Sequence, residues 1–343
     1  SGGGMHIRDA DPTINDCTFH KNKAGSGGGM SVFESTSPIT DCVFTENLAT
    51  GSGGAVHNLK SAPVFTDCLF ADNNAQANGG GMFFDDVPSN LIITRCDFFR
   101  NLAADNGGGA FMRVLSALNV TFDDCPFVEN RADSGGGISA LGSSINFTDC
   151  DFLTNVALST SSGDGGGGAF LTKGIAVNML RCNFDDNTAK DGAGVYVTLR
   201  EATFTLCKFR DNLARPFVGT GDGGGVWAES PFAPGQTPAK IDFINTLFLR
   251  NEAKDNGGGV YFDGDAANAA QFDPLLTFCT FVNNIADDSG GGLFYTDTGS
   301  GDGIDPEITS SIFWDNTDVG GSDESAQIHR GGIGSAIFRY NDI

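Results

Sequence analysis

One short pattern recurs along the chain and constrains its fold more than any other feature. The pattern is C-x-F-x-x-N-x-A, followed after a short spacer by a glycine run and two alternating apolar residues. The segments Cys42–Ala49 and Gly53–Val56 form a clear copy. Nine copies begin with Cys, and three more keep Phe and Asn but begin with Thr246, Ser311 or Ala336. Copies at intervals of 25 to 39 residues indicate a repeat array.

Each copy predicts three short strands separated by bends. Apolar residues five and three positions before the Cys alternate, as Val120 and Phe122 do before Cys125, which is the period of a strand with one buried face. Cys and Phe form a second inward pair, and Met30 and Val32 are an example of the third. Three such strands cannot bury their inner faces within one repeat, whereas parallel stacking of the repeats buries them all. The predicted fold class is all-β, a single right-handed parallel β-helix of about twelve coils.

We expect one continuous domain, residues 1–343, with loop insertions in its second half. The insertions are residues 158–164, 215–222, 229–240, 263–273 and 296–305. The last three fall at one corner of three consecutive coils, so these loops are expected to lie side by side. Loops on one face of a solenoid commonly carry binding, which makes this corner a candidate binding surface. Plain surface elongation without a role is the alternative.

The asparagine of the pattern is the main candidate structural residue. An inward-turned Asn in every coil can hydrogen-bond its neighbours and the turn backbone, which predicts a ladder along one corner. The ladder positions are Asn22, Asn47, Asn73, Asn101, Asn130, Asn155, Asn187, Asn212, Asn251, Asn284, Asn316 and Asn341. The glycine runs recur in coil after coil, so we interpret them as bends rather than as phosphate cradles.

Nine cysteines would normally suggest a disulfide framework, but here all of them occupy one position of the repeat. In a stack they lie one above the next with parallel side chains, which makes bridging awkward. Thr246, Ser311 and Ala336 fill the same position, so it requires a small side chain rather than sulfur chemistry. We therefore expect buried free thiols, and bridges between neighbouring coils are the alternative.

The formal net charge of −23 argues against nucleic acid and anionic lipid as partners, because their phosphates would be repelled. No apolar run approaches the length of a membrane span, so we expect no direct membrane insertion. Aspartates often precede the Cys, as Asp16, Asp41 and Asp67 do. We expect each to cap its own turn and predict no cofactor, with a file of bound calcium ions as the alternative.

The two halves of the pattern resemble the repeats of the chlamydial polymorphic outer-membrane proteins and of bacterial right-handed β-helix surface proteins more widely. Phe44–Asn47 with Gly53–Val56 matches the F-x-x-N and G-G-[AGI] halves, and Phe127–Asn130 with Gly135–Ile138 matches nearly as well. The resemblance covers essentially the whole chain. It implies a secreted or surface-displayed β-helix, and adhesion as a function.

Many parallel β-helices act on polysaccharides, so an enzymatic function is an alternative to a structural one. Asn316-Thr317-Asp318 echoes one motif of the polygalacturonases, but the accompanying Gly-His-Gly is missing. The insertions are too short to wall a deep cleft, and there are only two Trp residues for stacking sugars. The sequence therefore predicts no enzyme and no catalytic residues, with a polysaccharide lyase or hydrolase as an alternative.

The predicted function is that of an extracellular or cell-surface structural protein, a subunit of a head-to-tail filament or surface assembly. Both termini fall at matching phases of the repeat, so a second copy could continue the coil, although a fragment of a longer β-helix has the same property. The predicted interface is Gly2, Gly3, Gly4, Met5, Phe338, Asn341 and Ile343. Its partner is the same protein. The alternative is a stand-alone adhesin that binds a host or neighbouring-cell surface.

Overall fold

The computed structural model describes residues 2–114, 119–142, 144–161, 163–174, 176–215, 219–229, 239–264, 273–297, 304–332 and 336–339. Two compact units are present: Ser1–Leu158 with Gly167–Phe170, and Ser159–Gly166 with Leu171–Ile343. The boundary falls within β25 (Ala169–Thr172). One continuous coil over residues 1–343 stays a prediction of the sequence.

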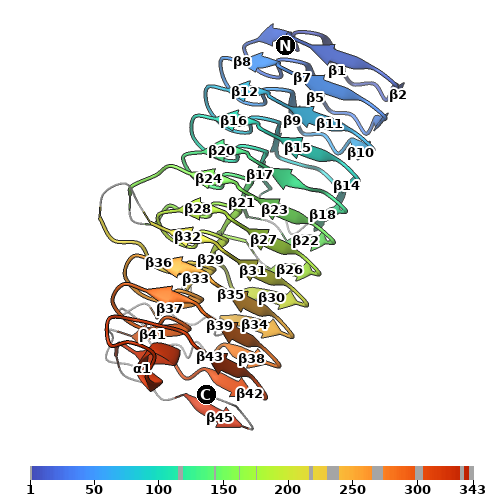
Figure 1. Cartoon of the computed structure of the whole chain (residues 1–343). Helices are drawn as coiled ribbons and strands as arrows, with labels where there is room; N and C mark the ends of the chain where they lie inside the picture. Colours follow the sequence, from blue (N-terminus) through green and yellow to red (C-terminus); the bar gives the residue numbers. More distant parts are fainter. Residues whose placement is uncertain are drawn as a thin grey trace. The chain divides into compact units, whose positions relative to one another are not determined.

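In the first unit the strands form four parallel sheets, A to D (Figure 1). Sheet A contains, in hydrogen-bonded order, β1 (Met5–Arg8), β5 (Met30–Phe33), β9 (Val56–Leu59), β13 (Met82–Asp85), β17 (Ala110–Arg113) and β21 (Ile138–Leu141). Sheet B contains β2 (Ile14–Asn15), β6 (Pro38–Thr40), β10 (Val64–Thr66), β14 (Leu91–Thr94), β18 (Asn119–Asp123) and β22 (Ser144–Thr148). Sheet C contains β3 (Thr18–His20), β7 (Val43–Thr45), β11 (Leu69–Ala71), β15 (Asp97–Phe99), β19 (Phe127–Val128) and β23 (Asp151–Leu153). Sheet D contains β4 (Lys23–Ala24), β8 (Leu48–Ala49), β12 (Asn74–Ala75), β16 (Leu102–Ala103), β20 (Arg131–Ala132) and β24 (Val156–Ala157).

In the second unit the same four sheets recur, and one short helix, α1 (Glu324–Gln327), interrupts the pattern near the C-terminus. Sheet A contains β29 (Val195–Thr198), β33 (Val226–Glu229), β37 (Val260–Gly264), β41 (Leu293–Asp297) and β44 (Ile328–Arg330). Sheet B contains β26 (Ala176–Leu180), β30 (Glu201–Thr205), β34 (Lys240–Ile244), β38 (Leu275–Thr277), β42 (Glu307–Thr309) and β45 (Ile337–Arg339). Sheet C contains β27 (Asn183–Asp185), β31 (Lys208–Arg210), β35 (Leu247–Leu249), β39 (Thr280–Val282) and β43 (Ile312–Trp314). Sheet D contains β28 (Thr188–Ala189), β32 (Leu213–Ala214), β36 (Glu252–Ala253) and β40 (Ile285–Ala286).

This architecture is a right-handed parallel β-helix, as the repeat predicted, with one more strand per coil than expected. The additional strand is the two-residue strand after the ladder Asn, such as β8, in which Ala49 is fully buried. Sequence periodicity did not reveal it because two residues are too few to show an alternation.

Residues in the left-handed region of backbone space make the bends of each coil. One precedes the Cys and another precedes the ladder Asn: Asp41 has φ 51° and Glu46 has φ 53° on either side of β7. A third bend uses the glycine run, where Gly107 has φ 68° and a Cβ on Gly108 would lie 2.5 Å from the backbone nitrogen of Arg131. The bends explain why the apolar alternation breaks three residues before the Cys.

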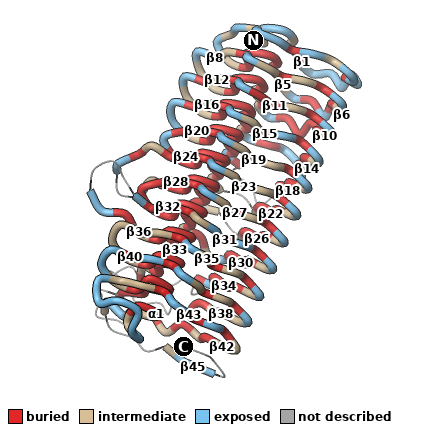
Figure 2. The backbone as a smooth tube through the Cα atoms, viewed as in Figure 1, coloured by how far each residue is buried: buried red, intermediate tan, exposed pale blue. Residues whose placement is uncertain are grey.

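Stacked aromatic rings fill the inner side of the coils. In sheet C of the first unit, the Phe127 ring lies 4.5 Å from that of Phe98 and 5.0 Å from that of Phe152, and the rings are nearly parallel. Phe122 of sheet B meets Phe127 edge-on, with an interplanar angle of 64°. Figure 2 shows that buried positions recur from coil to coil in each unit. The core is therefore narrow but densely packed.

The Cys position needs a small side chain that can donate a hydrogen bond. All nine cysteines are free, and the Cys42 thiol donates to the carbonyl oxygen of Thr40 at 3.1 Å. Thr246 and Ser311 make the equivalent bond with their hydroxyls, at 3.2 and 3.1 Å. Burial raises the pKa of the Cys42 thiol to about 11. The thiol at this position is thus a hydrogen-bond donor at the bend and only weakly nucleophilic.

Asn58 is an inward polar side chain that finds no partner. It is fully buried on β9, in register with Val32 and Phe84, and neither amide atom makes a hydrogen bond among the described residues. Replacing Asn58 with leucine should raise the free energy of unfolding by about 2 kcal/mol, because the cost of the buried unpaired amide disappears. Chemical denaturation measures the change, and a loss of stability would contradict it.

Candidate functional site

Within each unit the ladder asparagines are hydrogen-bonded from coil to coil. The side-chain amide of Asn130 donates to the carbonyl oxygen of Phe98 at 2.8 Å and to Oδ1 of Asn155 at 3.1 Å. Its own Oδ1 accepts from the backbone and side-chain nitrogens of Asn101, both at 3.0 Å. The bonded side chains follow the order Asn22, Asn47, Asn73, Asn101, Asn130 and Asn155 in the first unit, and Asn187, Asn212, Asn251, Asn284 and Asn316 in the second. These amides are engaged in structure and are not free to bind a ligand.

A glutamine continues the ladder beyond Asn316. The backbone and side-chain nitrogens of Asn316 donate to Oε1 of Gln327, at 3.3 and 2.8 Å, and the Gln327 amide donates to the carbonyl oxygen of Asn316. Gln327 belongs to α1, whose Ala326 is also fully buried. The sequence did not suggest a helix at this end of the chain. Asn341, the predicted next ladder residue, lies outside the described residues.

The last predicted copy of the pattern is out of register. Phe338 was expected in the Phe position of the repeat, but β45 pairs with β42 and places Phe338 opposite Ile308. Ile308 stands three residues before Ser311, which takes the Cys position, so Phe338 belongs to sheet B rather than sheet C. The phase was wrong because the segment 318–327, which contains α1, interrupts the repeat, and an F-x-x-N match alone cannot fix the register across it.

Four of the other predicted interface residues, Gly2, Gly3, Gly4 and Met5, are at the opposite end of the chain. Gly3 and Gly4 are exposed, and the nitrogens of Gly4 and Met5 both donate to the carbonyl oxygen of Gly29 at 2.8 and 3.0 Å. Gly2 is half-buried. Ile343 lies outside the described residues, as does most of the loop corner at 229–240, 263–273 and 296–305.

Arg–Asp pairs between neighbouring coils account for many surface carboxylates. The residue before the ladder Asn makes several of them: Arg100 donates to Asp72 from Nε at 2.7 Å and from a terminal nitrogen at 2.9 Å. Arg250 donates to Asp211 in the same two-pronged way, at 2.7 Å for both bonds. The Arg100 guanidinium also lies 4.0 Å above the Phe99 ring. The Arg100 guanidinium thus pairs with a carboxylate of the preceding coil while it lies on an aromatic ring of its own coil.

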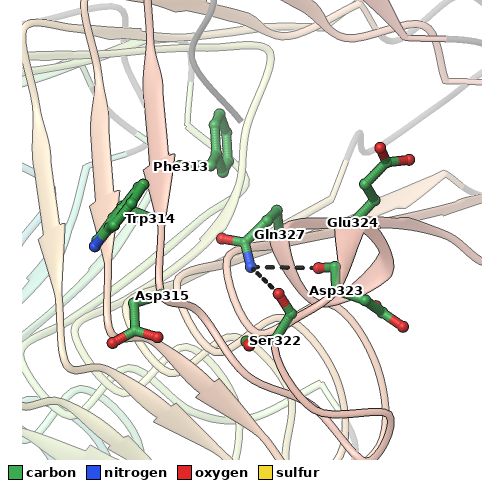
Figure 3. Close-up of a pocket in the computed structure, with 7 residues that line it drawn as sticks. All are labelled: Phe313, Trp314, Asp315, Ser322, Asp323, Glu324 and Gln327. Atoms are coloured by element: carbon green, nitrogen blue, oxygen red, sulfur yellow. Dashed lines mark hydrogen bonds between the residues drawn. The ribbon is translucent and has the colours of Figure 1, made fainter.

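An exposed hollow of about 600 Å³ in the second unit is the candidate functional site (Figure 3). It is lined by Phe313, Trp314, Asp315, Ser322, Asp323, Glu324 and Gln327. In Figure 3, Trp314 and Asp315 lie on one side, Ser322, Asp323 and Glu324 lie on the other, and Gln327 stands between them. Trp314 is 65% exposed, whereas Trp227, the second tryptophan of the chain, is 9% exposed. An indole presented so openly beside carboxylates is a typical binding surface.

The carboxylates of the hollow differ in how they are held. Asp323 caps α1 and accepts from the Ser325 hydroxyl at 2.7 Å, and these hydrogen bonds, that to the hydroxyl first, lower the pKa of Asp323 below its usual value. No described ion pair includes Asp315, Asp323 or Glu324. The hollow therefore offers negative charge that the described part of the chain does not neutralise.

Gln327 and Asp318 are already occupied by structural bonds. The Gln327 side-chain nitrogen donates to the carbonyl oxygens of Asn316, Ser322 and Asp323. The Asp318 carboxylate accepts from the backbone nitrogens of Gly320 and Gly290, at 2.7 and 3.3 Å. The sequence Asn316-Thr317-Asp318, which matches part of a hydrolase motif, thus has structural roles in this chain. Asn316 contributes its amide to the ladder, and Asp318 contributes its carboxylate to a turn.

Sequence reasoning missed a file of outward aromatic side chains on sheet A of the second unit. Rings stack from Tyr196 to Trp227 at 4.3 Å, from Trp227 to Tyr261 at 6.2 Å, and onward through Phe294 to His329. The signal was present, since each of these residues stands second in its strand. The tyrosines and Trp227 are at most 9% exposed, so the file packs against itself and leaves few ring faces for a ligand.

A second polar file precedes the glycine runs and brings the buried carboxylate of Asp191 close to the half-buried carboxylate of Asp222. The backbone nitrogen of Asp222 donates to Asp191 at 3.1 Å, and Asp222 in turn accepts from the backbone and side-chain nitrogens of Asn256 at 2.9 and 3.1 Å. Burial raises the pKa of Asp222 to about 6 from 3.8. Among the described residues, no three His, Cys, Asp or Glu side chains lie together so as to hold a metal ion.

Asp222 predicts a pH-dependent stability. The folded state favours the protonated carboxyl of Asp222. The contribution of this group to the free energy of unfolding is therefore fully present below pH 3.8 and is lost as the pH rises through about 6. Asp222→Asn should therefore raise the free energy of unfolding by about 2 kcal/mol at pH 8 and change little at pH 4. Denaturation at both pH values measures this. Asp186→Asn, at an exposed position, is the control, and an equal gain at both pH values would contradict the prediction.

The comparisons with known proteins support the fold. A family model described as "right handed beta helix region" matches residues 1–112. Neither the curated proteins nor the solved structures compared with the chain gave a match. No helix within the described ranges is long and apolar enough to cross a membrane.

Proposed function

We propose that the protein is a non-enzymatic β-helix that works outside the cell and binds a partner at a surface through the hollow around Trp314. The observation that carries the proposal is the exposed indole beside unpaired carboxylates, on a chain whose repeated polar side chains serve the coil itself. The resemblance of the repeats to those of displayed bacterial β-helices supports an adhesive role. Binding of this kind needs an exposed, rigidly held side chain and no catalytic group.

The way in which the carboxylates in and near the hollow are held favours binding over catalysis. A glycosidase needs two carboxyl groups facing one glycosidic bond, with one of them held protonated. In the hollow Asp323 is a helix cap with a lowered pKa, and Asp318 nearby is bound by backbone nitrogens. The fold itself does not decide, because right-handed β-helices include both polysaccharide lyases and non-enzymes.

Free thiols are compatible with a location outside the cell. Burial raises the pKa of Cys279 to about 12, so very little thiolate is present at neutral pH to react with an oxidant. The net charge of −23 keeps the surface solvated and favours basic partners. We propose no cofactor.

The test compares labelled wild-type protein with Trp314→Ala on immobilised cell-surface protein and polysaccharide. We expect the wild type to be retained and the variant to lose most of that retention, with no new reducing ends or unsaturated sugars released. Trp314 is exposed, so its removal should leave the fold intact, which circular dichroism checks. Equal retention of both proteins would show that the hollow is not the binding contact. Release of sugar fragments would show that the protein is an enzyme.

Self-assembly is the second candidate, favoured by one observation. Phe338 is 48% exposed, although its partner in register, Ile308, is fully buried. A coil stacked on β45 would cover this ring, and the covering coil can come from the same chain or from a second copy. Sedimentation velocity should show association that Phe338→Asp abolishes, and a monomer at all concentrations would exclude self-assembly through this ring.

A further inference from the structure

We propose that the hollow at Trp314 binds an arginine side chain of a partner polypeptide, with the guanidinium lying on the indole and paired with Asp315. The proposal rests on the surface-binding function above and names the chemistry of the contact. Each half of the contact occurs elsewhere in the chain, where an arginine lies on an aromatic ring of its own coil and pairs with a carboxylate of the preceding coil.

The position of Asp315 in the repeat is one that binds arginine. Asp315 directly precedes the ladder residue Asn316, as Asp72 and Asp211 precede theirs. Arg100 and Arg250, from the next coil, grip those two carboxylates with two nitrogens each. Asp315 has the same left-handed backbone, with φ 53° against 56° for Asp72, but no cation pairs with it among the described residues. A guanidinium supplied by a partner would complete the pattern.

The position of Trp314 supplies the second half. Trp314 ends β43 as Phe99 ends β15, and the Arg100 guanidinium lies 4.0 Å above the Phe99 ring. An indole attracts a cation more strongly than a phenyl ring does, and its 65% exposure leaves a face open to a ligand. A planar guanidinium can stack on the indole while its edge donates to Asp315, which a lysine ammonium cannot do with two parallel bonds.

The rest of the hollow selects for a ligand rich in donors. Asp323 and Glu324 on the opposite side add carboxylate acceptors, and the Gln327 amide is engaged on both its nitrogen and its oxygen. The Ser322 hydroxyl and the Trp314 indole N–H are the remaining uncharged polar groups of the lining, and the carboxylate oxygens outnumber them. A neutral sugar needs donors as well as acceptors from its site, whereas a guanidinium carries five N–H groups and accepts none. The chemistry therefore favours arginine over saccharide.

The experiment titrates the full chain with three capped tripeptides in about 0.15 M salt, where long-range attraction is screened. The peptides carry arginine, citrulline or lysine between two glycines; citrulline keeps the shape of arginine without its charge. The 15N-indole signal of Trp314 is followed by NMR and identified by its loss in Trp314→Phe. The signal of Trp227, which is 9% exposed, serves as the internal reference. We expect saturable shifts of the Trp314 signal with arginine, about threefold weaker binding with lysine, and no shift with citrulline.

Asp315→Asn tests the pairing without straining the backbone, because asparagine tolerates a positive φ. It should weaken arginine binding about threefold to fivefold. Asp186→Asn removes the same charge at the same repeat position, with φ 55°, and should leave binding unchanged. Shifts of equal size with citrulline, or unchanged affinity in Asp315→Asn, would overturn the proposal. If the predicted arginine binding is not observed while Trp314→Ala still abolishes surface retention, the binding function stands and the ligand class is wrong.

Discussion

Replacing Asn130 with leucine is expected to lower the free energy of unfolding by about 4 kcal/mol. The side chain is fully buried, and its amide bonds Asn155 and the carbonyl of Phe98 while its oxygen accepts from two nitrogens of Asn101. Leucine would leave these partner groups without hydrogen bonds inside the coil, and a buried unpaired group costs about 1–3 kcal/mol. Urea or guanidinium denaturation followed by circular dichroism measures the difference.

Asn58→Leu is the matched control for this experiment. Both asparagines are fully buried in the first unit and both receive the same new side chain, but the Asn58 side chain makes no hydrogen bond among the described residues that could be lost. The two variants should therefore change stability in opposite directions. Loss of stability in both would mean that the cost is steric, and an unchanged Asn130→Leu would mean that the ladder contributes little to folding.

The fold was predictable because one pattern repeats often enough to define a geometry. Phe127 and Phe152 could be placed at the same position of two stacked strands from spacing alone, and sheet C pairs them in register. The Asn spacing likewise placed Asn101, Asn130 and Asn155 along one corner, where the structure bonds them. Repetition makes each local inference testable against its neighbours, which a single copy does not allow.

The sequence-based predictions failed where the repeat stops or where a strand is too short to show a period. Two-residue strands such as β8 carry no period, so a fourth sheet was not anticipated. Beyond Asn316 the chain departs from the pattern, and a glutamine in a short helix takes the next ladder position. Phe338 consequently shifts by one sheet, because nothing in F-x-x-N distinguishes a repeat from a coincidence after an irregular segment.

The candidate site lies in this same irregular region, which explains why the sequence did not reveal it. Trp314 belongs to an ordinary strand of the repeat, and in sequence it resembles any other outward residue. Its surroundings come from Ser322, Asp323 and Glu324, whose positions depend on how α1 folds back against the last coils. The residue type alone was not a sufficient signal, because Trp227 is also an outward residue of a strand and packs into the aromatic file.

Phe127→Ala is expected to lower the free energy of unfolding by about 4 kcal/mol, because it removes an aromatic ring from a site that cannot collapse. The ring is fully buried between those of Phe98 and Phe152, whose positions are fixed by the sheet on either side. Phe127→Leu keeps most of the volume and should cost about 1–1.5 kcal/mol, while Val128→Ala, on the outward side of the same strand, should cost less than about 1 kcal/mol. Denaturation of the three variants measures the order. Since the inward side chains are stacked one coil above another, an Ala cavity at Phe127 also deprives both neighbouring rings of a face contact, so a loss no greater than that of Val128→Ala would contradict the inward packing on which the whole coil depends.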